Sequence, residues 1–536
     1  MKITFKKNTR PVRLTQAATA LAISLAGITG AQAYQFDTGN PDINASLGGT
    51  LRYNLGMRAE GRRDDVVAAG NNSTYSYDKG DIYINRLDLL TEFDADFRQT
   101  VGVRLTGSAW YDQAFNDSPP SEMGGYDNGH WSSTTRRYGE GPSAEFLDAY
   151  VWGTHAFDNG VDVTGRLGRQ AILWGEVIAS SAHSVSYAQA PSDLNKLFST
   201  PGATAKETAL PVGSAWTQVQ LNPQLSLEGQ YFYEWRPNRW PEGGTFMAPL
   251  DFVLEGPDSG FGGLRNGGID RPHGAQYGLA VRYAPEWFSG GTLGFYARQF
   301  NETTFWTDLD FAGGEYNFRY AEKTRLYGFS LAKSLGGVST GFEMSVRKNT
   351  ALNSNSVLID GEGATGDTFH TLLNGQKFFG SSALWSSALL MGELAYSRWL
   401  SVDKNEALFN RCDTSARRTA GTNDSDYGCV TKDFASAFLV FSPSWTAVAP
   451  GWDLSASGSL SVGLHGNAAT LGGGNEGAGS YGLSMTASYN SQHDFTLAFN
   501  DNLANSKRTR EGVDTTNGLP LQDRGRVVFT YQTSLF

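Results

Sequence analysis

Apolar and polar residues alternate in short runs along most of the chain. In residues 47–57, Leu47, Leu51, Tyr53, Leu55 and Met57 share one parity, and Gly48, Thr50, Arg52, Asn54 and Gly56 share the other. Successive side chains of a β-strand point to opposite faces, so each run predicts a strand with one apolar and one polar face. We count about 18 such runs and expect 16–18 strands. Each run is close to the ~10 residues that a tilted membrane strand needs.

The connections between the runs are alternately short and long. Tight turns lie at 221–224 and 490–493, and long connections cover 113–143, 173–213, 237–275 and 399–433. Outer-membrane barrels have short periplasmic turns and long outer loops, and their closure leaves no unpaired strand edge in lipid. The pattern therefore predicts an all-β fold, a transmembrane antiparallel β-barrel over residues 34–536. A secreted β-sandwich or β-helix would not place aromatic residues at both ends of so many apolar faces.

The first 33 residues have the three parts of an export signal. Basic residues come first, an apolar stretch covers residues 17–30, and Ala31-Gln32-Ala33 fits a small-residue cleavage site. We predict a signal peptide over 1–33 and export by the general secretory route, because the apolar stretch is short for a membrane anchor, which is the alternative.

Composition and charge exclude several other classes of protein. The full chain carries a net charge of −11, and loss of the signal peptide removes five basic residues, so binding to nucleic acid is not expected. No apolar run in the body of the chain is long enough for a transmembrane helix. The seven histidines are scattered, so the sequence indicates no metal site and no cofactor.

Cys412 and Cys429 are the two cysteines of the chain, and a polar stretch separates them. In an oxidising compartment such a pair forms a disulfide, here within the outer loop over 399–433. Two free thiols are the alternative.

Several stretches resemble the domain-of-unknown-function 1302 family. Arg166–Gln170 (RLGRQ), followed by Trp174–Glu176 (WGE), is similar to the family signature, and Asn85–Leu89 and Gln276–Ala280 also agree. The resemblance implies an outer-membrane barrel of a Gram-negative bacterium. The family has no settled activity, but its members accompany genes for the metabolism of hydrophobic compounds and for an exporter-like membrane protein. The resemblance therefore implies an envelope transport partner.

Charged and polar residues opposite the apolar faces are predicted to line the lumen. A mixture of charges in a pore sets its field and its selectivity. The plainer alternative is a ladder of ion pairs that lets the wall face water. The candidates are Arg52, Arg86, Asp88, Arg104, Asp112, Arg166, Gln170, Trp174, Glu176, Glu228, Glu234, Arg282, Arg298, Glu343 and Arg347.

Residues 174–212 lack strand alternation and contain apolar residues that an exposed loop would not need. The stretch 203–209 has helical propensity, and Leu194, Leu197 and Phe198 lie before it. We expect this segment to fold inward and to narrow or plug the lumen, because long loops with their own structure are usually functional. An outer cap packed on its neighbours is the alternative.

The preferred function is a channel for small molecules, with a preference for hydrophobic or aromatic compounds. Aromatic residues in the loops, including Trp235, Trp240 and Phe252, could hold ring-bearing solutes near the mouth or could simply pack the loops. Further expected partners are the lipid bilayer, lipopolysaccharide and the barrel-assembly machinery. A membrane-embedded hydrolase is the first alternative, but the nucleophile-like stretch Gly337–Gly341 starts a strand and does not form the required strand-to-helix elbow. A surface adhesin or structural barrel without transport is the second alternative.

Overall fold

The computed structural model describes residues 33–68, 70–505, 508–509, 512–513 and 519–536. The predicted signal peptide lies outside these residues except for Ala33. Among the residues described, no helix is long and apolar enough to cross a membrane.

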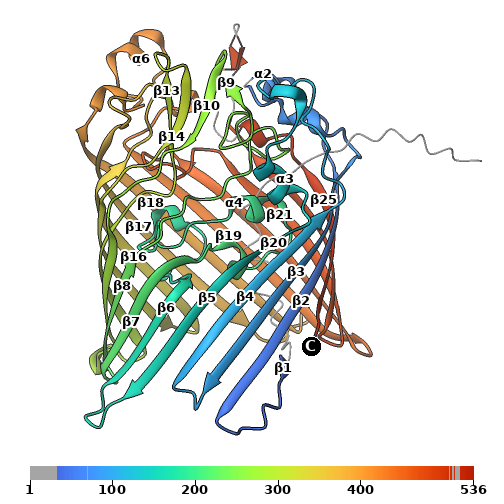
Figure 1. The fold of residues 1–536 in the computed structure, drawn as a ribbon, viewed down its shortest axis with the longest axis vertical. Helices are drawn as coiled ribbons and strands as arrows, with labels where there is room; N and C mark the ends of the chain where they lie inside the picture. The colour runs from blue at the N-terminus through green and yellow to red at the C-terminus, as the bar shows by residue number, and fades with distance from the viewer. Residues whose placement is uncertain (1–32, 69, 506–507, 510–511, 514–518) are drawn as a thin grey trace, which may run out of the picture.

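Eighteen antiparallel strands form a closed barrel (Figure 1), which confirms the predicted fold and strand number. The first nine are β2 (Ile43–Arg58), β3 (Ile82–Phe97), β4 (Val101–Asp112), β5 (Ser143–Ala156), β6 (Asp162–Gln170), β7 (Val212–Asn222), β8 (Leu225–Phe232), β11 (Gln276–Tyr283) and β12 (Gly291–Phe300). The other nine are β15 (Thr324–Leu335), β16 (Val338–Ala351), β17 (Thr365–Phe379), β18 (Ser387–Lys404), β19 (Asp433–Ala449), β20 (Trp452–His465), β21 (Gly479–Tyr489), β22 (His493–Leu503) and β25 (Arg526–Ser534).

Each barrel strand pairs with its neighbours in sequence, and β2 closes the barrel against β25. In this seam Tyr53 lies opposite Tyr531 and Leu55 opposite Phe529. The short strand β1 (Tyr34–Gln35) adds to β2 at the end of the barrel where the C-terminus lies (Figure 1). Because the seam pairs the first long strand with the last, no long edge of the barrel sheet is left unpaired.

Parity divides each strand into an outer apolar face and an inner polar face. Leu279, Leu394 and Leu483 are more than half exposed on the outside, whereas Arg52 and Asn54 are buried on the inside. In a soluble protein such a surface would favour aggregation, but in a bilayer the lipid chains cover it. The fold therefore defines an integral outer-membrane protein.

Short turns and long connections alternate around the barrel. The turn between β15 and β16 contains only Gly336 and Gly337, both with positive φ, which glycine adopts without steric cost. The long connections gather at the opposite end, at the top of Figure 1. That end is the extracellular one in bacterial barrels.

The long connections contain short helices and two small sheets. The helices are α2 (Asp64–Ala68), α3 (Ser133–Gly139), α4 (Leu194–Ser199), α5 (Ala205–Thr208) and α6 (Ser415–Ala420). The 3-10 turns are η1 (Asn72–Ser76), η2 (Asp127–Gly129), η3 (Ser181–His183), η4 (Glu286–Phe288), η5 (Glu406–Leu408), η6 (Ser425–Tyr427) and η7 (Leu519–Leu521). The four-stranded sheet contains β9 (Ser259–Gly260), β10 (Leu264–Ile269), β13 (Trp306–Asp310) and β14 (Glu315–Arg319), and the two-stranded sheet contains β23 (Arg508–Thr509) and β24 (Gly512–Val513).

The loops also carry the disulfide. Cys412 and Cys429 are bonded to each other, as the sequence predicted. Asn467, in the connection between β20 and β21, donates its side-chain amide to the carbonyls of Ser425 and Cys429 at 2.8 Å each. The disulfide loop is therefore packed onto the neighbouring loop.

Candidate functional site

The connection between β6 and β7, called here the β6–β7 segment (residues 171–211), contacts inward-facing side chains on opposite sides of the barrel. It contains η3, α4 and α5, and α4 lies within the outline of the barrel in Figure 1. Its contacts, described next, are mostly between charged side chains of the wall and backbone groups or charged side chains of the segment.

Two carboxylates of the wall hold the first half of the segment. Glu393 of β18 accepts hydrogen bonds from the backbone N–H groups of Ile178, Ala179 and Ser180 at 2.7, 3.1 and 2.6 Å. Glu343 of β16 accepts in the same way from Val185 at 2.7 Å and from Glu176. Hydrogen bonds to a charged acceptor are stronger than neutral ones, so these carboxylates fix the path of residues 176–185.

Two buried arginines hold the same stretch through its carbonyls. Arg298 of β12 donates to the carbonyls of Val185 and Tyr187 at 2.8 Å each, and Arg347 of β16 donates to that of Ser184 at 3.1 Å. The two arginines thus bind backbone carbonyls, and Glu343 and Glu393 bind backbone N–H groups, in a part of the segment that has little regular structure.

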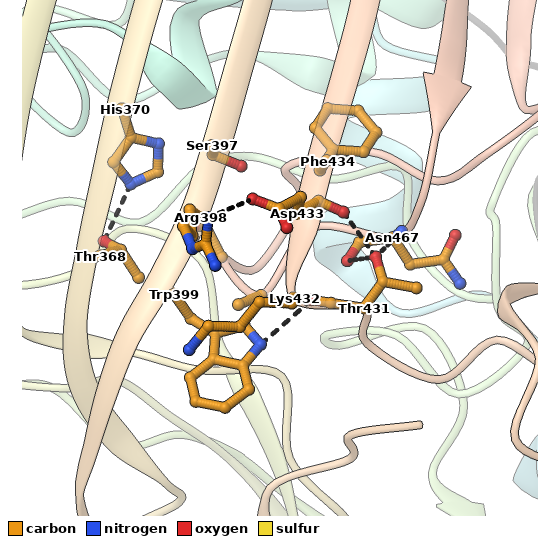
Figure 2. A pocket seen from close by; sticks show the side chains of 12 residues that line it. Thr368, His370, Ser397, Arg398, Trp399, Thr431, Lys432, Asp433, Phe434 and Asn467 are labelled. Atoms are coloured by element: carbon orange, nitrogen blue, oxygen red, sulfur yellow. Dashed lines mark hydrogen bonds and ion pairs between the residues drawn. The ribbon is translucent and has the colours of Figure 1, made fainter. Parts of the chain in front are cut away.

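A pair of histidines links the segment to β17. The Nδ1 atoms of His183 and His370 are 3.1 Å apart, and His183 Nε2 lies 2.8 Å from the carbonyl of Gly473. A carbonyl only accepts, so Nε2 of His183 carries the proton and its Nδ1 accepts from His370. Burial lowers the pKa of His183 to about 4, which keeps it neutral. Figure 2 shows the other side of His370, where Thr368 contacts its Nε2.

The second half of the segment is held on the opposite wall. Arg52 of β2 forms a bidentate ion pair with Glu207, at 2.7 and 3.0 Å, and Lys206 pairs with Glu92 of β3 at 2.7 Å. Burial alone would raise the pKa of Glu207, but the guanidinium of Arg52 brings it down to about 2. Glu207 is therefore ionised at any physiological pH.

A third group of charges fixes the middle of the segment near β4 and β5. Glu145 of β5 pairs with Lys196 of α4 at 3.3 Å and with Arg239 of the β8–β11 loop at 2.8 Å. Arg239 also pairs with Asp193 at 2.6 Å. Since these side chains are nearly fully buried, removing one partner would leave an uncompensated charge.

The remaining predicted lumen residues also have partners. Glu228 of β8 accepts from the indole N–H of Trp174 at 2.8 Å and pairs with Arg282 at 2.9 Å. Arg86 pairs with Asp88 at 3.0 Å, and Arg104 with Glu92 at 2.8 Å. Asp112 accepts backbone hydrogen bonds from Asn85 and Ala114, Gln170 donates to the Ser214 carbonyl, and Arg166 lies over the rings of Tyr150 and Trp216.

Glu234 differs from this set, and the expectation that it lies in the lumen was wrong. β8 ends at Phe232, so the strand parity does not extend to residue 234. Glu234 pairs with Arg169 at 2.8 Å, and Arg169 shares the outward parity of Leu167 on β6. Their ion pair therefore belongs to the outer face of the barrel.

The wall formed by β20 and β21 has a different surface. Its inward side chains are small and mostly carry hydroxyl groups, among them Ser457, Ser459, Ser461 and Ser484, and these four are half-buried. Within the described residues, the β6–β7 segment forms no side-chain hydrogen bond or ion pair with β20, β21 or β22. This wall is called here the serine wall, and among the described residues it takes no part in the polar attachment of the segment.

Aromatic residues form a row from the outer loops to the segment. Ring centroids lie 4.8 Å apart between Trp235 and Tyr320, 6.3 Å between Tyr320 and Phe305, and 6.2 Å between Phe305 and Trp240. Trp240 in turn lies 6.2 Å from Phe198 of α4. Trp235, Trp240, Phe305 and Phe198 are only partly buried, so this aromatic row presents apolar surface between the loops and the lumen.

Sequence reasoning missed Glu145, Asp193, Lys196, Glu207 and Arg239. Two of these had a readable local signal. Thr204 and Glu207 have the spacing of a capping box and form one at the start of α5, and Asp193 is the N-cap residue of α4. Glu145, Lys196 and Arg239 act through partners far away in the sequence, which no local pattern indicates.

The barrel fold and its apolar exterior define an outer-membrane β-barrel protein. The model of the family of proteins of unknown function DUF1302 matches residues 14–535, nearly the whole chain, so the protein belongs to this family, as the motifs indicated. No curated protein matches the sequence significantly.

Solved structures resemble the chain at low sequence identity. The match to Pseudomonas putida OprB covers 92% of this chain and 94% of that one, at 10% identity and a TM-score of 0.36. The match to Acinetobacter baumannii OccAB3 covers 92% and 99%, at 11% identity and a TM-score of 0.41. The match to Pseudomonas aeruginosa OpdK, solved with vanillate, covers 92% and 98%, at 10% identity and a TM-score of 0.39.

Proposed function

We propose that the protein is an outer-membrane channel for small molecules, and that the β6–β7 segment narrows its lumen. The observation that carries this proposal is the attachment of one segment to both Glu343 of β16 and Arg52 of β2, on opposite sides of the barrel. A loop that served as an outer cap would not need buried ion pairs with inward-facing residues. A filled barrel without transport would not need an uncovered wall.

The solute route in this proposal follows the serine wall. Most lumen charges are paired with the segment or with each other, so they are not free to hold a solute. The serines of β20 and β21 offer small, neutral, half-exposed side chains with inward parity. Such a surface favours uncharged or weakly charged solutes over ions.

The aromatic row supports a preference for solutes with an apolar or ring-bearing body. Ring faces at 4.8–6.3 Å spacing provide successive stacking surfaces from the loops to α4. A solute that leaves one ring would meet the next without full hydration in between. Delivery to or from a transport partner in the envelope, and insertion by the barrel-assembly machinery, belong to the same proposal.

Single-channel recording of the purified mature chain in planar bilayers tests the proposal. We expect small, discrete conductance steps, and faster uptake of a neutral aromatic solute than of a charged solute of the same size into proteoliposomes. A correctly folded barrel that passes neither ions nor solutes would overturn the channel function. Such a result would favour an adhesin or a structural barrel, and hydrolysis of added lipid or peptide would favour an enzyme.

A further inference from the structure

A groove of about 480 Å³ lies on the outer, lipid-facing side of the barrel. The strand register explains it, because Ala297 of β12 lies between Leu279 of β11 and Tyr327 of β15 as their direct partner. The small side chain of Ala297 leaves a depression between the two large ones. Phe329 and Met344 extend the apolar lining, so the groove fits a hydrocarbon chain.

Cations border the groove at its extracellular end. Arg325 precedes the groove residue Tyr327 by two positions on β15, and Lys348 follows the groove residue Val346 by two positions on β16. Both therefore face outward, and both are exposed. They stand directly opposite each other in the strand pair.

The charges of this pair are incompletely neutralised by the protein. Lys348 pairs with Asp367 of β17 at 2.6 Å. Within the described residues, the side chain of Arg325 has neither a hydrogen bond nor an ion pair. Like charges directly opposite each other on neighbouring strands destabilise a sheet, so an external anion at this point would be stabilising.

Further cations continue the row along the same edge. Arg398 of β18 faces outward as the register partner of Phe369 and pairs with Asp433 at 3.4 Å. Lys432 lies next to it, with its ammonium group 3.2 Å from the centroid of the Trp399 ring. Figure 2 shows the ion pair between Arg398 and Asp433, with Lys432 and Trp399 beside it. The other side of the barrel differs, because Leu87 and Tyr111 occupy outward positions near the same end of β3 and β4.

We propose that the groove and the cations at its rim form a binding site for a phosphorylated, acylated lipid of the outer leaflet. One acyl chain lies in the groove over Ala297, and a phosphate lies between Arg325 and Lys348. Arg398, which faces outward on β18, is placed to receive a second phosphate of the same headgroup. The lipid headgroup is favoured over free phosphate because the cations adjoin an apolar groove in the membrane-facing wall.

Native mass spectrometry of the detergent-purified barrel tests this site, with diphosphorylated lipid A as the probe. The variant R325Q/K348Q should retain this lipid about tenfold less than the unmodified protein, since each lost cation removes charge-assisted contacts with phosphate. The matched control R62Q/K79Q removes two exposed cations at the same end of the barrel, next to β2 and β3, and should retain the lipid normally. Ala297→Trp, which fills the groove and leaves the charges intact, should also lower retention.

Three outcomes would overturn the proposal. One is equal retention of diphosphorylated lipid A and its dephosphorylated form, because phosphate would then not be recognised. A second is an equal loss in R325Q/K348Q and R62Q/K79Q, which would indicate general attraction by surface charge. The third is unchanged retention in R325Q/K348Q. Heat-modifiable migration on gels shows that each variant is folded, and none of these readouts depends on channel activity.

Discussion

The two sides of the lumen are built in opposite ways. From β2 to β8, and again from β12 to β18, inward side chains are large and charged, and they hold the β6–β7 segment through buried contacts. On β20 and β21 most inward side chains are small and neutral, and among the described residues the segment forms no side-chain hydrogen bond or ion pair with them. The charged side chains of this lumen therefore attach the segment, and the small neutral side chains do not.

This difference changes how the charged residues should be interpreted. A count of inward arginines and carboxylates suggests a strongly charged pore, but most of these groups have a protein partner. Buried charges that are paired are costly to disturb, so they serve to keep the segment in one position. In the proposed channel, the width and the hydroxyl groups of the uncharged side would then decide which solutes pass.

The largest expected effect comes from removing what the charged side holds. Deletion of Ser181–Glu207 with a short Gly/Ser bridge should raise single-channel conductance severalfold and reduce discrimination between solutes. The reason is that, in the proposed arrangement, the segment narrows the lumen and its removal opens that space. Deletion of the exposed helix Ser415–Ala420 serves as a control and should change conductance little. Unchanged conductance in a correctly assembled Ser181–Glu207 deletion would mean that the segment does not limit the route.

Obstruction of the serine wall should have the next largest effect. Ser459→Trp adds a large side chain to the proposed route and should lower conductance by about half or more, since a pore is limited by its narrowest point. Leu460→Trp places the same side chain on the lipid-facing side of β20 and should leave conductance unchanged. If both variants conduct normally, the route follows another wall.

Weakening one attachment of the segment should make the conductance less steady, with little effect on the size of the main conductance step. Glu393→Gln removes the charge that accepts three backbone N–H groups, and each hydrogen bond to a charged group contributes about 1.5–3 kcal/mol. We expect more frequent conductance fluctuations with an unchanged main level. Glu406→Gln, in an exposed loop, is the control. Recordings as quiet as those of the unmodified protein would show that Glu393 is dispensable for attachment.

A smaller effect should depend on pH, in the β8–β11 loop that ties Arg239 to the segment. Burial, together with the nearby carboxylate of Glu255, raises the pKa of Glu242 to about 8. The protonated form is favoured in the folded loop, so its contribution to stability is complete below the unfolded pKa of about 4.3 and is lost as the pH rises through about 8. Hydrogen exchange in residues 233–258 should therefore accelerate as the pH rises from about 5 to about 8 and level off above that, after correction for intrinsic rates. Glu242→Gln should abolish this change, and persistence of the change in that variant would assign it to another group.

The smallest effect on transport is expected from the disulfide loop beside the serine wall. The disulfide joins residues that are 17 positions apart, and closing such a loop stabilises the folded loop by about 3 kcal/mol. The double variant Cys412→Ser/Cys429→Ser should assemble normally and conduct normally, while proteolysis within residues 405–432 becomes faster. Failure to assemble would show that the loop is needed for the barrel itself.

Much of the barrel was predictable because the alternation of apolar and polar residues can be read within each strand alone. A strand that separates lipid from water must alternate, so residues such as Leu51 and Arg52 reveal the strand and its two faces. The two cysteines were equally informative. The β13–β14 hairpin was missed because its strands have 5 residues each and pack on other loops, so the membrane rule does not apply to them.

The arrangement inside the lumen was less predictable. The sequence indicated that residues 174–212 are unusual, but partners such as Glu145 and Arg239 depend on where the whole segment runs. Parity also fails where a strand ends, as for Glu234, because the chain turns after Phe232. The aromatic residues were readable as a group, whereas their order as a row depends on loops that lie next to each other only in the folded protein.

The seam between β2 and β25 also bears on how the protein assembles. Tyr53 and Tyr531 pair across almost the entire length of the exported chain, and contacts between such distant residues form slowly. Arg52, which holds Glu207, lies on the same strand as this seam, one residue before Tyr53. The strand that closes the seam therefore also carries the partner of Glu207, so docking of β2 against β25 and attachment of the β6–β7 segment are expected to depend on each other.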